Sequence, residues 1–278
     1  MSKIPTICIA LPVHNGEKFI RKKIESILAQ TFSDYELIIT DNCSKDNTLK
    51  ICREFAENDS RIKIISHKNN IGAKRNFYSS LKQSKNEFFV WTAVDDLMES
   101  TFLEKNIAQL KNNKNLVGSI SKIDYYSNKV KSEFNFIQLN SLTGTYDKKV
   151  RFFLTKSSAN IIYSIFRKNQ LELSLVEESI GTWDSAIILN ILKYGDINVL
   201  EEKLLEFFDE GISTTNLYNR ITQEDKDMGE ISSSDSYFLK WCLKHLGSRI
   251  ILKNLDIFIR LNFSTLIKLF LDYLKRNH

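Results

Sequence analysis

The sequence has little proline and no stretch rich in glycine, serine and proline. Only two prolines occur in its 278 residues, and no low-complexity tract or internal repeat interrupts it. A flexible linker between two independent domains is therefore not expected. Hydrophobic residues make up 42% of the chain and charged residues 26%, a balance that lets a chain of this length bury one large core.

Cysteines and long apolar segments are also scarce. The cysteines Cys8, Cys43, Cys52 and Cys242 lie at spacings that match no zinc site and no disulfide framework. No uncharged run reaches the ~18–20 residues of a membrane-spanning helix, and the first residues lack the apolar core of a signal sequence. These absences predict a cytoplasmic protein whose thiols are reduced.

The charge of the chain is mild and mixed. The formal net charge is +5, and lysines and arginines alternate with acids through most of the sequence. This balance favours a small polyanionic ligand or a membrane surface as partner, and no nucleic acid is expected. The sequence also lacks a G-x-G-x-x-G motif and a Walker lysine, which argues against a dinucleotide enzyme and a P-loop nucleotide hydrolase.

Strand and helix patterns alternate in the first third of the chain. Apolar runs predict strands over residues 7–13, 35–40, 62–65 and 88–94. Helices are predicted between them, the first capped by Asn15, the second by Asp46 or Asn47, and the third over residues 73–82. This alternation predicts an α/β fold with an open parallel sheet and right-handed crossovers.

The pattern loosens after about residue 100. We expect helices over residues 102–110 and 183–192, and strands over 117–126, 130–139, 160–166 and 199–208, the last at a sheet edge. From about Ser234 the chain is predicted to be helical, with a polar stripe opposite a broad apolar face. The stripe contains Arg249, Lys253, Asp256, Arg260 and Ser264, and the face contains Leu252, Leu255, Ile259, Phe263, Leu266 and Phe270.

Acidic residues follow two of the predicted strands. Asp41 comes directly after the second strand, and Asp95 and Asp96 follow the fourth. The carboxyl ends of the strands form the ligand-binding edge of an open α/β sheet. Asp41 can accept a hydrogen bond from a nucleobase imide or a ribose hydroxyl, although such residues also favour plain turns. The adjacent pair suits Mg²⁺ or Mn²⁺ with a polyphosphate, the alternative being a cap for the next helix.

A third loop precedes the predicted helix over residues 73–82. It contains Asn70 and Gly72, and Arg75 follows in the first turn of the helix. Gly72 permits a tight turn, and Arg75 could reach a diphosphate near the start of the helix. This loop is a weak signal when taken alone.

Together these segments resemble the family 2 glycosyltransferases, which have the GT-A fold. The matching segments are residues 10–17, 26–31, 41–48, 70–72 with Asn76, and Asp95-Asp96. The resemblance implies a nucleotide-binding open sheet flanked by helices, with a C-terminal helical extension. We expect one catalytic domain with a nucleotide-sugar half (1–112) and an acceptor half (113–215), followed by the extension (216–278).

The resemblance also implies roles for single residues. Nucleotide contacts are expected from Pro12, His14, Glu17, Asp41, Asn70, Gly72, Arg75 and Asp95. Asp41 would recognise the base, so uridine or thymidine diphosphate is the preferred carrier of the sugar and guanine stays open. Asp95 would hold Mn²⁺ or Mg²⁺, with Asp96 as a second metal ligand beside it. The first acid of the family's D-x-D element is replaced by Ala93, which makes Asp95 the main ligand.

The second half should supply a catalytic base, which in this family is an acid near the start of a helix. Asp184 is the best match, with Glu177 and Glu178 as alternatives, and Asp184 could instead cap the helix. Trp183 takes the place of a preceding acid and can stack on an acceptor sugar. The implied reaction is a single displacement with inversion at the anomeric carbon, in which Asp184 removes the proton of the acceptor hydroxyl.

The expected acceptor is a glycan or a lipid-linked glycan in surface polysaccharide assembly. A nucleotidyltransferase is disfavoured because residues 12–17 lack a Gly-rich loop with lysine or arginine. A catalytically inactive glycan-binding or scaffold protein on the same fold stays open, because Ala93 and Trp183 replace acids.

The C-terminal helix could pack its apolar face on the catalytic domain or on a second subunit of a homodimer. Alternatively, it could make the protein peripheral on the inner face of the membrane as a basic amphipathic helix.

Overall fold

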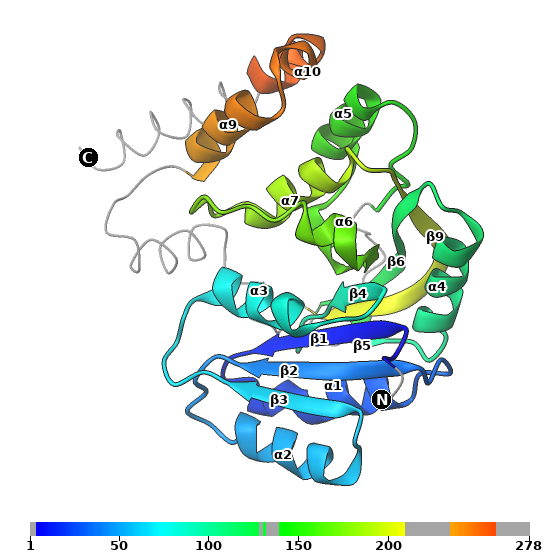
Figure 1. Ribbon diagram of the computed structural model, residues 1–278, viewed down its shortest axis with the longest axis vertical. Helices are drawn as coiled ribbons and strands as arrows, with labels where there is room; N and C mark the ends of the chain where they lie inside the picture. Colours follow the sequence, from blue (N-terminus) through cyan, green and yellow to red (C-terminus); the bar gives the residue numbers. More distant parts are fainter. Residues whose placement is uncertain (1–3, 128–129, 132–138, 209–233, 260–278) are drawn as a thin grey trace.

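The computed structural model describes residues 4–127, 130–131, 139–208 and 234–259. Within them, nine strands form one mixed sheet in the order β3-β2-β1-β4-β8-β6-β9-β5, with β7 paired to β6, and helices lie on both faces (Figure 1). The strands are β1 (Ile7–Val13), β2 (Tyr35–Asp41), β3 (Ile62–Ser66), β4 (Phe88–Trp91), β5 (Leu97–Met98), β6 (Leu116–Ser127), β7 (Val130–Lys131), β8 (Ile165–Arg167) and β9 (Asp196–Phe208). The helices are α1 (Glu17–Leu28), α2 (Thr48–Asn58), α3 (Ala73–Gln83), α4 (Phe102–Asn112), α5 (Tyr146–Lys156), the 3₁₀ helix η1 (Ala159–Tyr163), α6 (Lys168–Glu172), α7 (Trp183–Ile191), α9 (Ser234–His245) and α10 (Ser248–Lys253).

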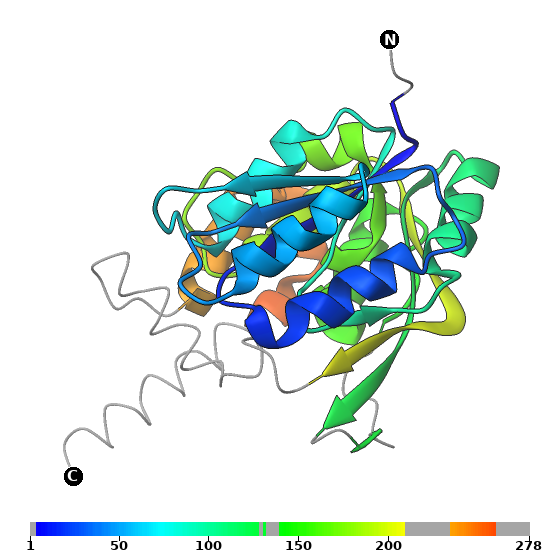
Figure 2. The same ribbon diagram turned by 90° about the horizontal axis from the view of Figure 1, so that it is seen from below.

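Strands β3, β2, β1 and β4 form the parallel half of the sheet. Every residue of β1, β2 and β4 is buried, because α3 covers one face of the sheet and α1 and α2 cover the other (Figures 1 and 2). Strands covered on both faces have continuous apolar sequences, which is why their positions could be predicted. The predicted α/β architecture is confirmed, and one sheet contains strands from both predicted halves of the catalytic domain.

Strand β4 is shorter than the predicted strand over residues 88–94. The indole N–H of Trp91 donates to the carbonyl oxygen of Phe77 at 3.0 Å, and the amide of Thr92 makes a last sheet-like bond to the carbonyl of Ala10 at 2.9 Å. The chain then leaves the sheet. Asp95 and Asp96 therefore lie in the segment between β4 and β5, beyond the end of the strand.

The prediction that Asn15 caps the first helix is wrong. The backbone of Asn15 has φ +51°, and its side-chain oxygen accepts a hydrogen bond from the amide of Lys45 at 2.8 Å. Gly16 is the N-cap residue of α1 instead. The amide side chain of Asn15 thus connects two loops rather than starting a helix.

The prediction of one strand over residues 160–166 is also wrong. The hydroxyl of Ser158 accepts a hydrogen bond from the amide of Asn160, which starts the 3₁₀ helix η1. The short strand β8 follows and pairs antiparallel with both β4 and β6. A Cβ at Gly118 on β6 would lie 2.9 Å from the ring of Phe166, so glycine is needed for this close pairing.

Strand β9 is not a plain edge strand. It runs parallel to β6 for most of its length, and on its other side β5 pairs antiparallel with Leu205 and Glu206. Because β5 directly follows Asp96, it fixes the acidic segment against the end of β9. Of the strand predicted over residues 130–139, Val130 and Lys131 form β7, and residues 132–138 lie outside the described part of the chain.

The C-terminal helices pack on α5 and α7 with a different face from the one predicted. The core side includes Ile257 and Phe258, whereas Leu252, Leu255 and Ile259 of the predicted apolar face are exposed. Two residues of the predicted polar stripe instead pair with α5, Lys253 with Asp147 and Asp256 with Arg151. The positions 260, 263, 264, 266 and 270 of that prediction lie outside the described residues. Among the described helices, none is long and apolar enough to cross a bilayer.

Candidate functional site

The loops that follow β1 and β2 are joined to each other at the carboxyl edge of the sheet. Backbone N–H groups of the first loop donate to side chains of the second: Asn15 to Ser44 at 2.9 Å, Gly16 to Thr48 at 2.8 Å and Glu17 to Asp46 at 3.0 Å. The carboxylate of Glu17 accepts from the backbone amide of Asn47 at 3.0 Å and from its side chain at 2.6 Å, and both bonds lower the pKa of Glu17. Glu17, predicted as a nucleotide contact, therefore braces the second loop.

Asp41 is the last residue of β2, and only 1% of its surface is exposed. Its carboxylate accepts hydrogen bonds from the amide of Ser44 and from the hydroxyl of Ser66, both at 3.3 Å. These distances are long for such bonds, and a carboxylate has about four acceptor positions. Asp41 thus keeps capacity to accept a hydrogen bond from a ligand.

The loop before α3 is tied to the same edge through Asn42 and Asn70. Asn42 donates to the side-chain oxygen of Asn70 at 2.8 Å and accepts from the amide of Ile71 at 2.8 Å, and Asn70 accepts from the amide of Gly72 at 2.9 Å. Gly72 has φ +81°, and a Cβ there would meet no atom within 4 Å. The backbone at the start of α3 is therefore accessible for close approach by a ligand.

His14 lies between these loops. Its Nε2 is 3.2 Å from the side-chain nitrogen of Asn15 and 3.4 Å from that of Asn70, while its Nδ1 is buried without a hydrogen-bond partner. Pro12 is buried in β1 opposite Thr40, so it shapes the edge rather than exposing a contact surface. Of the predicted nucleotide contacts, His14, Asp41, Asn70 and Gly72 thus lie together.

Asp95 and Asp96 differ sharply in their surroundings. Asp95 is partly exposed, whereas Asp96 is 8% exposed and its carboxylate accepts a hydrogen bond from the backbone of Phe208 at the end of β9. Burial, with the neighbouring charge of Asp95, raises the pKa of Asp96, and Lys23 opposes this shift. Asp95 is therefore the better placed of the two to face a ligand.

Lys23 belongs to this region as well, although no sequence pattern predicts it. Lys23 is fully buried on α1, and its ammonium group donates to the backbone carbonyl of Asp96 at 2.7 Å. Burial lowers the pKa of Lys23 to about 8, and the carboxylates of Asp96 and Asp95 oppose the shift. A lysine on a helix normally faces solvent, so its inward position became visible only in the fold.

Replacing Lys23 with methionine is expected to lower the free energy of unfolding by about 3 kcal/mol. The carbonyl of Asp96 loses its donor, and the buried acidic segment loses its cation. Urea unfolding near neutral pH measures the effect. Lys22→Met is the matched control, because Lys22 is exposed and its loss should cost less than about 0.5 kcal/mol. Equal losses in the two variants would contradict the bracing role of Lys23.

Trp183 and Asp184 begin helix α7. The ring centroid of Trp183 lies 5.3 Å from that of Phe77 and 6.0 Å from that of Tyr78, and Phe77 in turn lies 5.9 Å from Trp91. This chain of aromatic contacts packs the start of α7 against α3 and the end of β4. Asp184 is partly exposed in the first turn of α7, where its carboxylate accepts from the amide of Ser185 at 2.6 Å. Thr182 holds the N-cap position that was the alternative role for Asp184.

Glu178 is held in a separate set of contacts. Its carboxylate accepts from His245 at 2.7 Å and from Lys244 at 3.2 Å, both on α9. A hydrogen bond from its own backbone N–H and the contacts to Lys244 and His245 lower the pKa of Glu178 to about 2. Lys74 on α3 donates to the carbonyl of Glu178 at 2.7 Å. Glu178 therefore joins α9 to the segment before α7, while Glu177 is exposed.

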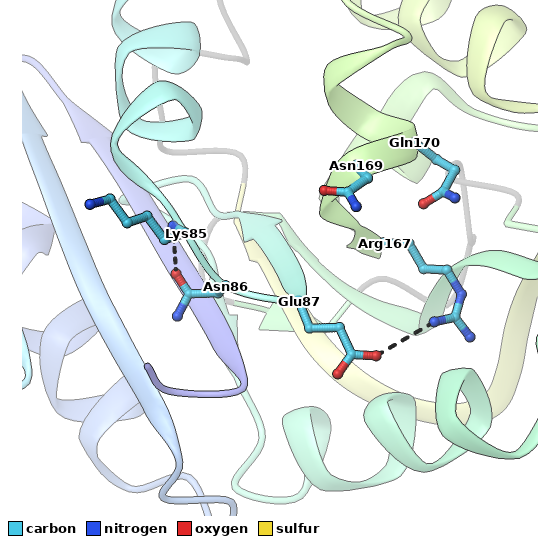
Figure 3. A pocket seen from close by; sticks show the side chains of 6 residues that line it. All are labelled: Lys85, Asn86, Glu87, Arg167, Asn169 and Gln170. Carbon is cyan, nitrogen blue, oxygen red and sulfur yellow. Dashed lines mark hydrogen bonds and ion pairs between the residues drawn. The ribbon is translucent and has the colours of Figure 1, made fainter. Parts of the chain in front are cut away.

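A hollow of about 500 Å³ lies at the opposite end of β4 from the acids (Figure 3). It is lined by Lys85, Asn86, Glu87, Arg167, Asn169 and Gln170. The guanidinium of Arg167 donates to the carbonyl oxygens of Leu116 at 2.9 Å and Leu110 at 2.6 Å and pairs with Glu87. With Arg167 already engaged and no predicted site residue in its lining, this hollow is not the candidate site.

The described residues contain no cluster of three or more histidine, cysteine or acidic side chains that would form a complete metal centre. Mg²⁺ and Mn²⁺ commonly bind through one or two carboxylates together with substrate phosphate oxygens. The partly exposed carboxylate of Asp95 fits that mode, and Arg75 is exposed on the first turn of α3. Asp95 is therefore the residue here whose chemistry suits a cation held jointly with substrate phosphate oxygens.

The sequence matches a protein family model described as Glycosyl transferase family 2 over residues 8–169. It is 35% identical over 108 residues to an Escherichia coli protein named UDP-Glc:alpha-D-GlcNAc-diphosphoundecaprenol beta-1,3-glucosyltransferase WfgD, covering 38% of this chain and 42% of that protein. It is 29% identical over 124 residues to an uncharacterized glycosyltransferase of Haemophilus influenzae, covering 45% of this chain and 38% of that protein. The match thus covers about two fifths or less of the length of the curated relatives.

The fold is similar to that of TarS from S. aureus. The structure of TarS 1-349 in complex with UDP-GlcNAc has a TM-score of 0.63 and 17% identity, covering 92% of this chain and 79% of that chain. A second crystal structure of TarS 1-349 has a TM-score of 0.62 and 18% identity, covering 93% of this chain and 72% of that chain. At this identity the likeness concerns the fold, and it confirms the predicted GT-A type of open sheet flanked by helices.

Proposed function

The chain belongs to glycosyl transferase family 2, and from this premise we propose that it transfers a sugar from a nucleoside diphosphate to a hydroxyl group of a glycan or lipid-linked glycan. The observation that carries the proposal is the hydrogen-bonded edge at which His14, Asp41 and Asn70 lie together. A uridine nucleotide is the proposed donor. This choice is supported by a relative named for UDP-glucose and a structural neighbour bound to UDP-GlcNAc.

The edge offers a distinct contact for each part of the nucleotide. Asp41 would accept from the imide N–H of the base, since its present hydrogen bonds are long. The partly exposed ring of His14, which lies beside Asn15 and Asn70, would contact a ribose or phosphate oxygen. The diphosphate would lie near the start of α3, where Gly72 allows close approach and Arg75 supplies positive charge.

Asp95 is the residue that would hold a Mn²⁺ or Mg²⁺ ion. Such a cation, when bound, offsets the negative charge of the departing nucleoside diphosphate. Asp96 is proposed to position Asp95 rather than to bind the ion itself, because its carboxylate bonds the backbone of Phe208 and its carbonyl bonds Lys23. Strand β5 fixes the same segment from the other side.

Asp184 is the proposed catalytic base. The acceptor oxygen bonds to the anomeric carbon as the bond from that carbon to the diphosphate oxygen breaks, and the hydroxyl proton moves to the carboxylate of Asp184. A single displacement of this kind inverts the anomeric centre. Trp183 is proposed to form part of the acceptor site, although its ring already packs on Phe77 and Tyr78.

A catalytically inactive glycan-binding or scaffold protein on the same fold is the second candidate. Ala93 replaces one acid of the D-x-D element, and Trp183 stands where an acid precedes the base in the family pattern. Only the enzyme would release nucleoside diphosphate from a nucleotide sugar. Slow hydrolysis of a UDP-sugar with Mn²⁺ therefore separates them.

A thermal-shift screen of nucleoside diphosphates with and without Mn²⁺ is the direct test of the donor proposal. UDP with Mn²⁺ at about a hundredfold excess over Kd should stabilise the protein by ~2.7 kcal/mol, which corresponds to about 5 °C in Tm. ADP at the same concentration is the control and should give a much smaller shift. If no nucleotide shifts Tm with Mn²⁺ present, the donor proposal is wrong.

A further inference from the structure

The outward surface of the C-terminal helices carries large apolar side chains. Leu252 is 70% exposed, Leu255 46% and Ile259 57%. Leu255 and Ile259 are four residues apart within the helical residues 255–259, so they project from one side. Ile257 and Phe258 between them are buried against the domain. This segment is therefore apolar on both its inner and its outer side.

Ion pairs fix the orientation of the segment. Lys253 pairs with Asp147 at 2.8 Å, and Arg151 forms a two-pronged pair with Asp256 at 2.9 and 2.8 Å. Turning the outer leucines inward would break both pairs and expose side chains that are now buried. Single exposed leucines are common on protein surfaces, but several on one outward side form a patch that needs a partner.

Positive charge gathers in the same part of the chain. The last 31 residues, 248–278, contain six lysines or arginines and two aspartates, so they carry +4 of the net charge of +5. Among the described residues, Arg249 on α10 and Lys240 on α9 are exposed. Arg249 lies three residues before Leu252 on α10, and an outward apolar patch beside a cation, in a basic segment of the chain, is the pattern of a surface that meets anionic lipid.

We propose that the C-terminal apolar face, formed by Leu252, Leu255 and Ile259, docks on an anionic lipid surface. The apolar side chains would enter the boundary between headgroups and acyl chains, and the basic side chains would lie among the anionic headgroups. A second copy of this chain fits the face less well, because two cationic segments would meet across the interface. The inference goes beyond the proposed transfer reaction and does not depend on it.

The docked face would remain connected to the proposed catalytic base. Lys244 and His245 on α9 bond Glu178, which lies in the segment that leads into Asp184. Figure 1 shows α9 and α10 in the same upper part of the molecule as α5 and α7, at the opposite end from α2. A membrane held by this face would therefore approach the molecule from the side of α7.

The test is flotation of the full chain with vesicles. Wild type is expected to bind phosphatidylglycerol–phosphatidylcholine vesicles and to bind pure phosphatidylcholine vesicles far less. Its binding to the anionic vesicles should weaken as the salt concentration is raised. The variant Leu252→Ser/Leu255→Ser should lower binding to the anionic vesicles by about tenfold or more. Both leucines are exposed, so the variant should keep the wild-type Tm and the UDP-dependent thermal shift.

Leu173→Ser/Tyr194→Ser is the matched control, since these side chains are 68% and 48% exposed on other elements. It should bind vesicles like wild type. Equal binding of wild type to neutral and anionic vesicles would overturn the proposal, as would unchanged binding of the leucine variant. A wild-type dimer that ignores vesicles and dissociates in the leucine variant would also overturn it and identify a second copy as the occupant.

Discussion

Asp184→Asn is expected to lower the rate of UDP release from a UDP-sugar by about 10³-fold, the middle of the range for losing a general base. Asparagine keeps the size of the side chain and can still accept the hydrogen bond from the amide of Ser185, but it cannot take a proton. The UDP-dependent thermal shift should be unchanged, because Asp184 lies on α7 and not on the loops after β1 to β3. Initial rates measured with Mn²⁺ check this expectation.

Glu177→Gln and Glu178→Gln are the controls for the choice of base. Glu177 is exposed, and its loss should leave the rate within about twofold of wild type. Glu178 already accepts from Lys244 and His245, so its loss should lower Tm through weaker attachment of α9 rather than slow the reaction. If Glu177→Gln abolishes UDP release while Asp184→Asn retains it, the base has been assigned to the wrong acid.

Asp95→Asn should raise the Kd for Mn²⁺ in the presence of UDP by about a hundredfold and remove the metal-dependent part of the thermal shift. The expected size is that of one charged ligand lost from a divalent site, a few kcal/mol. Electron paramagnetic resonance of free Mn²⁺ measures binding without relying on turnover. UDP without metal should still give its own smaller shift, because Asp41 and His14 are unchanged.

Variants of Asp96 and Ala93 are the controls for the Asp95 variant. Asp96→Asn should leave Mn²⁺ binding within about tenfold of wild type but lower the free energy of unfolding, because Asp96 is buried beside Lys23. Ala93→Asp restores the missing acid of the D-x-D element and should tighten Mn²⁺ binding. An Asp96 variant that loses Mn²⁺ as completely as the Asp95 variant would show that the ion needs both carboxylates.

The parallel half of the sheet could be predicted because burial leaves a plain signal in the sequence. Strands β1 to β3 are rich in large apolar residues, and the structure places them within one residue of the predicted bounds. Elements set by distant partners left no such signal. Strand β5 has two residues and exists because β9 lies beside it, and η1 depends on the hydroxyl of Ser158. The hydrophobic periodicity of the sequence contains no information about either of these contacts.

In the candidate site too, some residues could be placed from the local sequence and others only from contacts between distant segments. Asp41, Asn70 and Asp95 follow predicted strands or loops, so their places at one edge could be anticipated from topology. Lys23 could not, since its partner is 73 positions away along the chain. The sequence left open whether Leu252 and Leu255 face the domain or outward, because the ion pairs of Lys253 and Asp256 with α5 link segments more than a hundred residues apart.

The cross-bonding of the loops after β1, β2 and β3 has a consequence for engineering donor preference. Asn15, Asn42 and Asn70 each link one loop to another, so a substitution in one loop alters the backbone that its neighbours rest on. Libraries that randomise one loop at a time would mostly contain variants that have lost hydrogen bonds between the loops. Changing the accepted nucleotide should therefore require substitutions in two loops that are introduced and selected together.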